Sequence, residues 1–63
     1  MRADRLISLL LIIQSRGKVS AGTLAEELEV SERTIYRDID ALTTAGIPVY
    51  GEPGLDGGYA LLD

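Results

Sequence analysis

Several residue types are missing from this chain of 63 residues, which has neither cysteine nor histidine. Disulfides therefore cannot stabilise it, and the imidazole and thiolate ligands of most protein zinc sites are absent. We expect neither a metal nor another cofactor, and the lack of cysteine suits a cytoplasmic protein. Stability must come from an ordinary apolar core, for which a hydrophobic content of 46% is sufficient. Because a chain of about 60 residues buries only about 60% of its unfolded surface, one small domain is expected.

Long hydrophobic runs are also missing. The longest, residues 6–13, holds one serine among apolar residues, whereas a membrane-spanning helix needs about 20 residues. A secretory signal would continue into a cleavage site of small residues, but Gln-Ser-Arg-Gly-Lys follows at 14–18. That segment is typical of a helix end, so we expect a soluble and unprocessed protein.

Spacing of apolar residues predicts three helices. Residues 2–16 lack glycine and proline, and Leu6, Leu10 and Ile13 form a stripe at helical spacing. Further apolar residues lie off this stripe, which predicts contact with another domain or a second subunit; they are Ile7, Leu11 and Ile12. Gly17 ends this helix.

The other two helices begin at serines. Ser20 is the expected N-cap of a helix at 21–28, which turns Leu24 and Leu28 inward, and Ser31 caps a third helix at 31–45. In the third helix a buried stripe is predicted from Ile35, Ile39 and Leu42. Gly46 and Pro48 then stop the helix.

After the third helix the pattern becomes extended. Residues 47–50 and 59–62 are the expected strands, and the turn signals Pro-Gly at 53–54 and Asp-Gly-Gly at 56–58 lie between them. Three helices followed by a two-stranded hairpin predict an α+β, mostly α fold, the winged helix-turn-helix. We expect residues 1–63 to be a single such domain of a longer protein.

The central string Ser-Glu-Arg-Thr-Ile-Tyr-Arg-Asp-Ile at 31–39, with Leu-Ala-Glu-Glu-Leu at 24–28 and Gly-Gly-Tyr at 57–59, resembles a known family. It is similar to the amino-terminal DNA-binding domain of WYL-domain, DeoR-like bacterial transcriptional regulators. The resemblance covers almost the whole chain and implies a cytoplasmic transcription factor, dimeric at full length, with a C-terminal domain that senses an effector.

The sequence departs from the family pattern in two ways. Position 29 is Glu where the family has Gly in the turn between the second and third helices. A positive φ there would cost a non-glycine residue about 1 kcal/mol or more. The hairpin carries Glu52 and Asp56 in place of a basic residue, which weakens the expected contact between wing and phosphate.

If the apolar stripe of the third helix faces inward, the opposite face carries Arg33, Arg37, Asp40 and Thr44. Arginines one helical turn apart can reach the same stretch of major groove, where arginine binds guanine O6 and N7, and Arg33 is favoured for base contacts. Candidate phosphate ligands are the remaining polar residues of this side: Lys18, Ser20, Thr23, Ser31, Thr34 and Tyr36.

Some of these residues have structural alternatives. Ser20 and Ser31 can act as helix caps alone, and Arg37 can pair with Glu32 or Asp40 on the protein surface. Asp38 is expected to hold an arginine or the first helix rather than DNA. Tyr50 and Tyr59 are expected to pack across the strands.

The net charge of −4 opposes DNA binding, because such domains usually carry a basic surface. Six of the ten acidic residues, however, lie on the second helix and its exit, in the hairpin and at the end of the chain, away from the predicted groove face. We therefore expect one domain to bind DNA with modest affinity and to need a second copy bound to a neighbouring half-site. Alternatives are a winged-helix module for protein interaction and the regulatory head of a biotin-ligase-like protein. An enzyme is not expected, since nothing places the carboxylates in a pocket.

Overall fold

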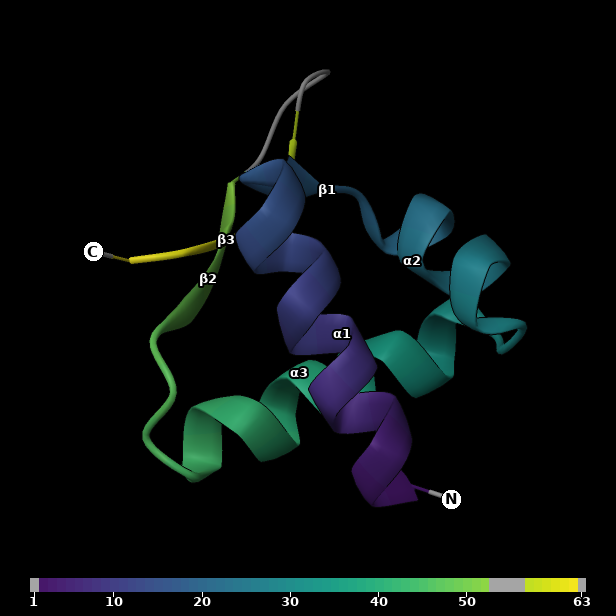
Figure 1. Cartoon of the computed structure of the whole chain (residues 1–63), viewed down its shortest axis with the longest axis horizontal. Coiled ribbons are helices and arrows are strands. Elements are labelled where there is room, and N and C mark those ends of the chain that lie inside the picture. The colour runs from purple at the N-terminus through teal and green to yellow at the C-terminus, as the bar shows by residue number, and fades with distance from the viewer. Residues whose placement is uncertain (1, 53–56, 63) are drawn as a thin grey trace.

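The computed structural model describes residues 2–52 and 57–62, without the side chains of Arg2 and Glu52. Its elements are α1 (Arg2–Arg16), β1 (Lys18–Val19), α2 (Ala21–Leu28), α3 (Glu32–Thr44), β2 (Val49–Glu52) and β3 (Gly58–Leu61). Figure 1 shows α1 crossing α3, with α2 beside one end of α3 and the sheet toward the other. The predicted winged helix-turn-helix is confirmed.

Local signals place the helix boundaries where the sequence predicts them. The side chains of Ser20 and Ser31 accept hydrogen bonds from the backbone N–H groups of Thr23 and Thr34, both at 3.1 Å. At the other ends, Gly17 has φ 86° and Gly46 has φ 90°, left-handed conformations that glycine adopts without steric cost. These four helix ends are therefore fixed by residues within one turn of them.

The sheet has one strand more than the predicted hairpin. Its order is β1-β3-β2, and both pairs of strands are antiparallel. Strand β1 consists of two residues, of which Val19 pairs with Tyr59 of β3. A segment this short shows no alternation in the sequence, so its strand character depends on a partner some forty residues away.

The two strands of the hairpin are confirmed with shifted ends. The first was predicted at 47–50 and is observed at Val49–Glu52, while the second was predicted at 59–62 and is observed at Gly58–Leu61. Pro48 has no N–H to donate to a ladder, so it precedes β2. Its carbonyl instead accepts a hydrogen bond of 2.8 Å from Leu62 N–H. The predicted turn residues 53–56 lie outside the described residues.

The core forms between the three helices and the sheet. Fully buried positions from each helix meet there, namely Leu9, Ile13, Leu24 and Ile35, together with Val19, Ile39, Leu42 and Val49. The predicted inward stripe of α3 is confirmed, and Leu28 of α2 packs against the core while partly buried. The core therefore fixes which side of α3 faces outward.

Helix α1 keeps two large apolar side chains exposed, as expected from their place off its stripe. Ile7 is 58% exposed and Leu11 is 56% exposed, whereas Ile12 is partly buried against the core. The two lie one helical turn apart, on the same side of α1. Contact of this pair with another domain or subunit stays a prediction. In the described part of the chain, no helix is both long enough and apolar enough to cross a membrane.

Candidate nucleic-acid interface

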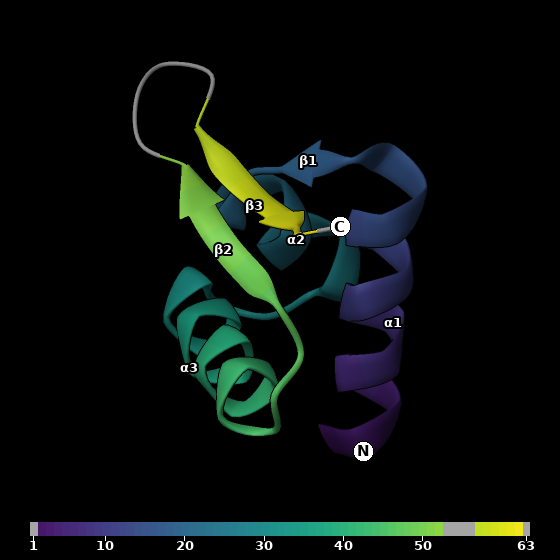
Figure 2. The same cartoon turned by 90° about the vertical axis from the view of Figure 1, so that its left-hand side faces the viewer.

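The outer face of α3 is open in the structure. Arg33, Arg37, Asp40 and Thr44 are all exposed, opposite the buried Ile35, Ile39 and Leu42. Figure 2 looks along α3, with α1 on one side of it and the sheet above. Helix α2 also packs against α3, and the exposed residues of α3 lie on the side away from this core. The helix can therefore present these polar side chains to a partner while its inner stripe stays in the core.

Arg33 and Arg37 form the cationic part of this face. The predicted alternative, an ion pair of Arg37 with Glu32 or Asp40, does not occur in the structure. Neither arginine makes a hydrogen bond or ion pair with any residue in 2–52 or 57–62. Both guanidinium groups thus keep their donors for a ligand, and each carries a fork of N–H groups that matches guanine or phosphate.

Ser31 and Thr34 form a polar pair at the start of α3. Besides capping the helix, Ser31 Oγ lies 3.1 Å from Thr34 Oγ1 within hydrogen-bonding geometry. Ser31 is exposed and Thr34 is partly buried. Ser31 therefore caps the helix and already makes two contacts with Thr34. When Thr34 Oγ1 is the donor of the pair, the exposed Ser31 hydroxyl can still donate a hydrogen bond to a phosphate oxygen, since a hydroxyl can donate one and accept two hydrogen bonds.

Ser20 and Thr23 make the equivalent pair at the start of α2, where Ser20 Oγ donates to Thr23 Oγ1 at 3.0 Å. A carboxylate lies nearby, because Glu32 Oε2 is 3.8 Å from the position that a Cβ on Gly22 would occupy. An acidic group is favourable at a helix N-terminus, which is also where a DNA phosphate would bind. Glu32 also lies in the first turn of α3, so this carboxylate is near the start of both helices and does not rank one phosphate site above the other.

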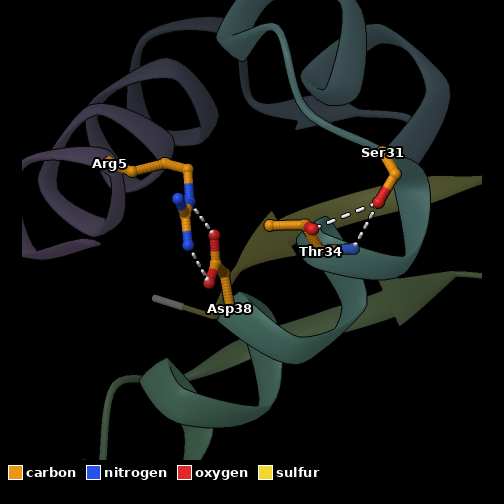
Figure 3. A network of polar contacts seen from close by, with 4 residues as sticks. All are labelled: Arg5, Ser31, Thr34 and Asp38. Carbon is orange, nitrogen blue, oxygen red and sulfur yellow. Dashed lines mark hydrogen bonds and ion pairs between the residues drawn. The ribbon is translucent and has the colours of Figure 1, made fainter. Parts of the chain in front are cut away.

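Asp38 is buried on α3 and anchors the helix to α1. It is 1% exposed, and its two carboxylate oxygens accept hydrogen bonds from Arg5 Nε at 2.5 Å and Arg5 Nη2 at 3.1 Å. Figure 3 shows this bidentate contact spanning the two helices. The hydrogen bond to Asp38 raises the pKa of the Arg5 guanidinium, an effect that burial partly opposes. The expectation that Asp38 holds an arginine and the first helix is confirmed.

Tyr36 lies on the flank of α3 that faces the wing. Its ring contacts the ring of Tyr59 edge to face, with centroids 6.3 Å apart, and it stays 48% exposed. Burial raises the pKa of Tyr59, with smaller contributions from Tyr36 and Asp40. Tyr59 also lies against Gly51, its cross-strand neighbour. The packing role predicted for Tyr59 is confirmed, and Tyr36 shares it.

The remaining candidates belong to the sheet and wing. Lys18 is exposed on β1 and pairs in register with Ala60, while Tyr50 pairs with Ala60 from the other side and is 41% exposed. Glu52 ends β2, and Asp56 lies outside the described residues. The contribution of the acidic wing to DNA binding therefore stays a prediction.

Arg5 is the site residue that sequence reasoning missed. The sequence predicts that Asp38 holds some arginine, but Arg5 is 33 positions away. Its one signal is that it lies in the first helix one residue before the inward stripe. Within residues 2–52 and 57–62, no group of three or more His, Cys, Asp or Glu side chains could hold a metal ion.

Comparison with known proteins agrees with this geometry. The HTH domain family matches residues 5–60. The whole chain is 41% identical over 63 residues to a curated relative from Bacillus subtilis (strain 168), described as the uncharacterized HTH-type transcriptional regulator YobV. The chain spans 20% of the length of that relative. No solved structure matches the chain. With a family match over nearly its full length and the fold described above, the chain belongs to the HTH domain family, in which the second helix of the motif docks in the major groove of DNA.

Proposed function

We propose that this domain reads double-stranded DNA in a sequence-specific manner, with α3 in the major groove. The observation that carries the proposal is the outer face of α3. Arg33 and Arg37 lie one turn apart there, exposed and without a partner among the described residues, directly opposite the buried stripe of the helix. A module that docks only onto proteins has no need of two unpaired arginines at this spacing.

The two arginines have different roles in this proposal. Arg33 lies in the first turn of α3, the part of a recognition helix that usually reaches base edges, so it is assigned to guanine. Arg37 lies one turn further along and is assigned to guanine or phosphate. Ser31, Thr34, Tyr36 and Lys18 are assigned to phosphates of the DNA backbone, as are Ser20 and Thr23 at the start of α2. Phosphate contacts position the helix, whereas base contacts supply the sequence preference.

The wider biological role is proposed from the resemblance and the relative. The sequence at 31–39 resembles that family, and the chain is similar to an HTH-type transcriptional regulator about five times as long. Both observations support the proposal that the chain is the DNA-binding domain of a cytoplasmic bacterial regulator. We assign it to the WYL-domain, DeoR-like group, with a C-terminal effector-sensing domain and a homodimeric full-length state. Two linked heads on adjacent half-sites would raise the modest affinity expected of one acidic domain.

DNA titration tests this proposal. A labelled duplex from upstream of the native gene, and a scrambled duplex of the same composition, are titrated at low and moderate salt. Each bidentate arginine–guanine contact discriminates by about 1–3 kcal/mol, roughly 5- to 150-fold in affinity. The Arg33→Ala/Arg37→Ala variant should therefore lose most of its preference for the native duplex and much of its total affinity.

The matched control is Arg33→Lys/Arg37→Lys, which keeps the net charge but loses the planar fork of donors. It should bind the scrambled duplex as the wild type does and lose preference for the native one. Wild-type protein that binds neither duplex, or an alanine variant that binds as the wild type does, would exclude the groove arrangement. The first of these results would favour the protein-interaction alternative.

A further inference from the structure

A polar hollow of about 220 Å³ lies beside the recognition helix, where the N-terminal half of α1 passes α3. Its lining consists of Arg5, Val30, Thr34, Arg37 and Asp38. Figure 3 shows Arg5 extending from α1 into the side of α3 that carries Thr34 and Asp38. Because Thr34 and Arg37 also belong to the candidate DNA interface, the hollow is continuous with it.

The hollow is cationic although it contains a carboxylate. Asp38 is neutralised by Arg5, whose Nε and Nη2 donate to its two oxygens. A guanidinium has five N–H groups, so this contact leaves three of them for another acceptor. The Arg5 side chain keeps 27% of its surface exposed, against 2% for Asp38. Arg37 then adds one unpaired positive charge at the rim.

The position of the hollow matches one edge of the major groove. Tyr36 contacts the wing on one flank of α3, whereas Thr34, Arg37 and Asp38 line the hollow beside α1. Positions 36 and 34 lie about 160° apart around an α-helix, since successive residues are about 100° apart. A helix seated in the groove has a phosphate backbone on either side of it, so the flank opposite the wing faces phosphates as well.

We propose that this hollow binds a backbone phosphate of the DNA, with Arg5 and Arg37 as its ligands. Arg5 is then both the anchor of α3 and a direct contact to the nucleic acid, supplied by a helix outside the helix-turn-helix motif. The assignment rests on the proposed DNA-binding function and deepens it, because it adds a second clamp on the side of the groove away from the wing.

Salt dependence of binding distinguishes a phosphate ligand from a purely structural pair. For B-DNA the slope of log K against log salt changes by about 0.9 for each phosphate that the protein no longer neutralises. The test variant is Arg5→Gln/Asp38→Asn, and the matched control is Arg16→Gln/Glu27→Gln, which removes the other ion pair between helices. Both double variants keep the net charge of the wild type. Binding to a duplex of random sequence is measured from about 50 to about 200 mM salt, after circular dichroism has compared their folding.

Because Arg37 stays in the hollow of Arg5→Gln/Asp38→Asn, the proposal predicts a slope shallower by up to about 0.9 for this variant and an unchanged slope for the control pair. Equal slopes for the wild type and the test variant would overturn it, provided that the wild type binds. If the wild type binds no duplex at all, both this proposal and the DNA-binding function fail. A third outcome excludes the phosphate site alone. In it the wild type binds DNA, Arg33→Lys/Arg37→Lys loses sequence preference, and Arg5→Gln/Asp38→Asn has the salt slope of the wild type.

A measurement on the wild type covers the case in which the test variant does not fold. The Nε–H resonance of each arginine is followed by ¹⁵N NMR during titration with the random duplex. A shift of Arg5 together with Arg37, without a shift of Arg16, supports the phosphate site. An unchanged Arg5 resonance at saturation contradicts it.

Discussion

Glu29 occupies a backbone conformation that glycine adopts more easily. Among residues 2–52 and 57–62 it is the single non-glycine residue with a positive φ, at 57°. It closes α2 through hydrogen bonds from Glu29 N–H to Glu26 O at 3.3 Å and from Val30 N–H to Ala25 O at 3.0 Å. This is the Schellman motif, whose left-handed position is usually glycine. Replacing Glu29 by glycine should therefore stabilise the domain.

The magnitude follows from two opposing contributions. A left-handed conformation costs an L-residue about 1–2 kcal/mol, while glycine loses about 0.5–1 kcal/mol more in backbone entropy on folding. Removing a negative charge from the C-terminal end of a helix adds about 0.3 kcal/mol or more. The side chain of Glu29 is exposed and makes no polar contact with the described residues. Glu29→Gly should thus stabilise by about 1 kcal/mol, which raises Tm by about 4–8 °C in a domain of this size.

Two variants separate backbone strain from charge in thermal unfolding followed by circular dichroism. Glu29→Gln removes the charge alone and should give only the smaller part of the gain. Gly46→Ala makes the opposite change in the same motif at the end of α3, where φ is 90° and nothing lies within 4 Å of the added Cβ. Gly46→Ala should lower Tm only because alanine is strained at this positive φ. A Tm of Glu29→Gly no higher than that of Glu29→Gln would refute the strain argument.

Other positions yield further expectations. Gly58→Ala would place a Cβ 2.9 Å from the backbone of Val19, so urea unfolding should show a loss of about 1–3 kcal/mol; Gly51→Ala, which meets only the Tyr59 ring at 3.3 Å, should lose less. Ser31→Ala removes the cap of α3 and should cost about 1 kcal/mol in the same assay, and equal stability would contradict the capping contact. Burial raises the pKa of Tyr59, so its stabilising contribution is complete below pH of about 10 and falls as pH rises through the raised pKa. Stability curves of Tyr59→Phe and wild type should therefore diverge above that pH, with the wild type losing more, and parallel curves would show that the raised pKa has no effect on folding.

What the sequence predicts correctly here is encoded within one helical turn. Ser20, Ser31, Gly17 and Gly46 each act on neighbours three or four positions away, and so the three helices are found with almost no error in their ends. The outward face of α3 follows from the same local periodicity. Once Ile35 and the other apolar positions of the stripe are buried, geometry alone directs Arg33 and Arg37 outward.

What the sequence does not predict depends on distant partners. Strand β1 exists because Lys18 and Val19 pair with β3, and no property of these two residues alone predicts that pairing. The same holds for Arg5 and Asp38, which are 33 positions apart, and for the contact between Tyr36 and Tyr59. Each of these contacts modifies the candidate interface, so the local pattern identifies the recognition helix and the tertiary structure defines its edges.

The acidic balance of the chain sets the strength of the proposed interaction. Of its six basic residues, Arg5 and Arg16 each neutralise a carboxylate within the fold, and Asp40 lies beside Arg33 and Arg37 on the outer face of α3. With Arg33 engaged on bases, the proposed phosphate ligands among them are Arg5, Arg37 and Lys18. Arg5 and Arg37 share one phosphate, so these three ligands neutralise two phosphates. The salt slope is then about −1.8, and affinity falls about 12-fold between about 50 and 200 mM salt. Proteins that bind about six to ten phosphates lose about 10³- to 10⁵-fold over that range. A single domain therefore gains little from charge and depends on the short-range fit of α3. In the proposed homodimer, a second coupled domain would combine that fit with higher affinity.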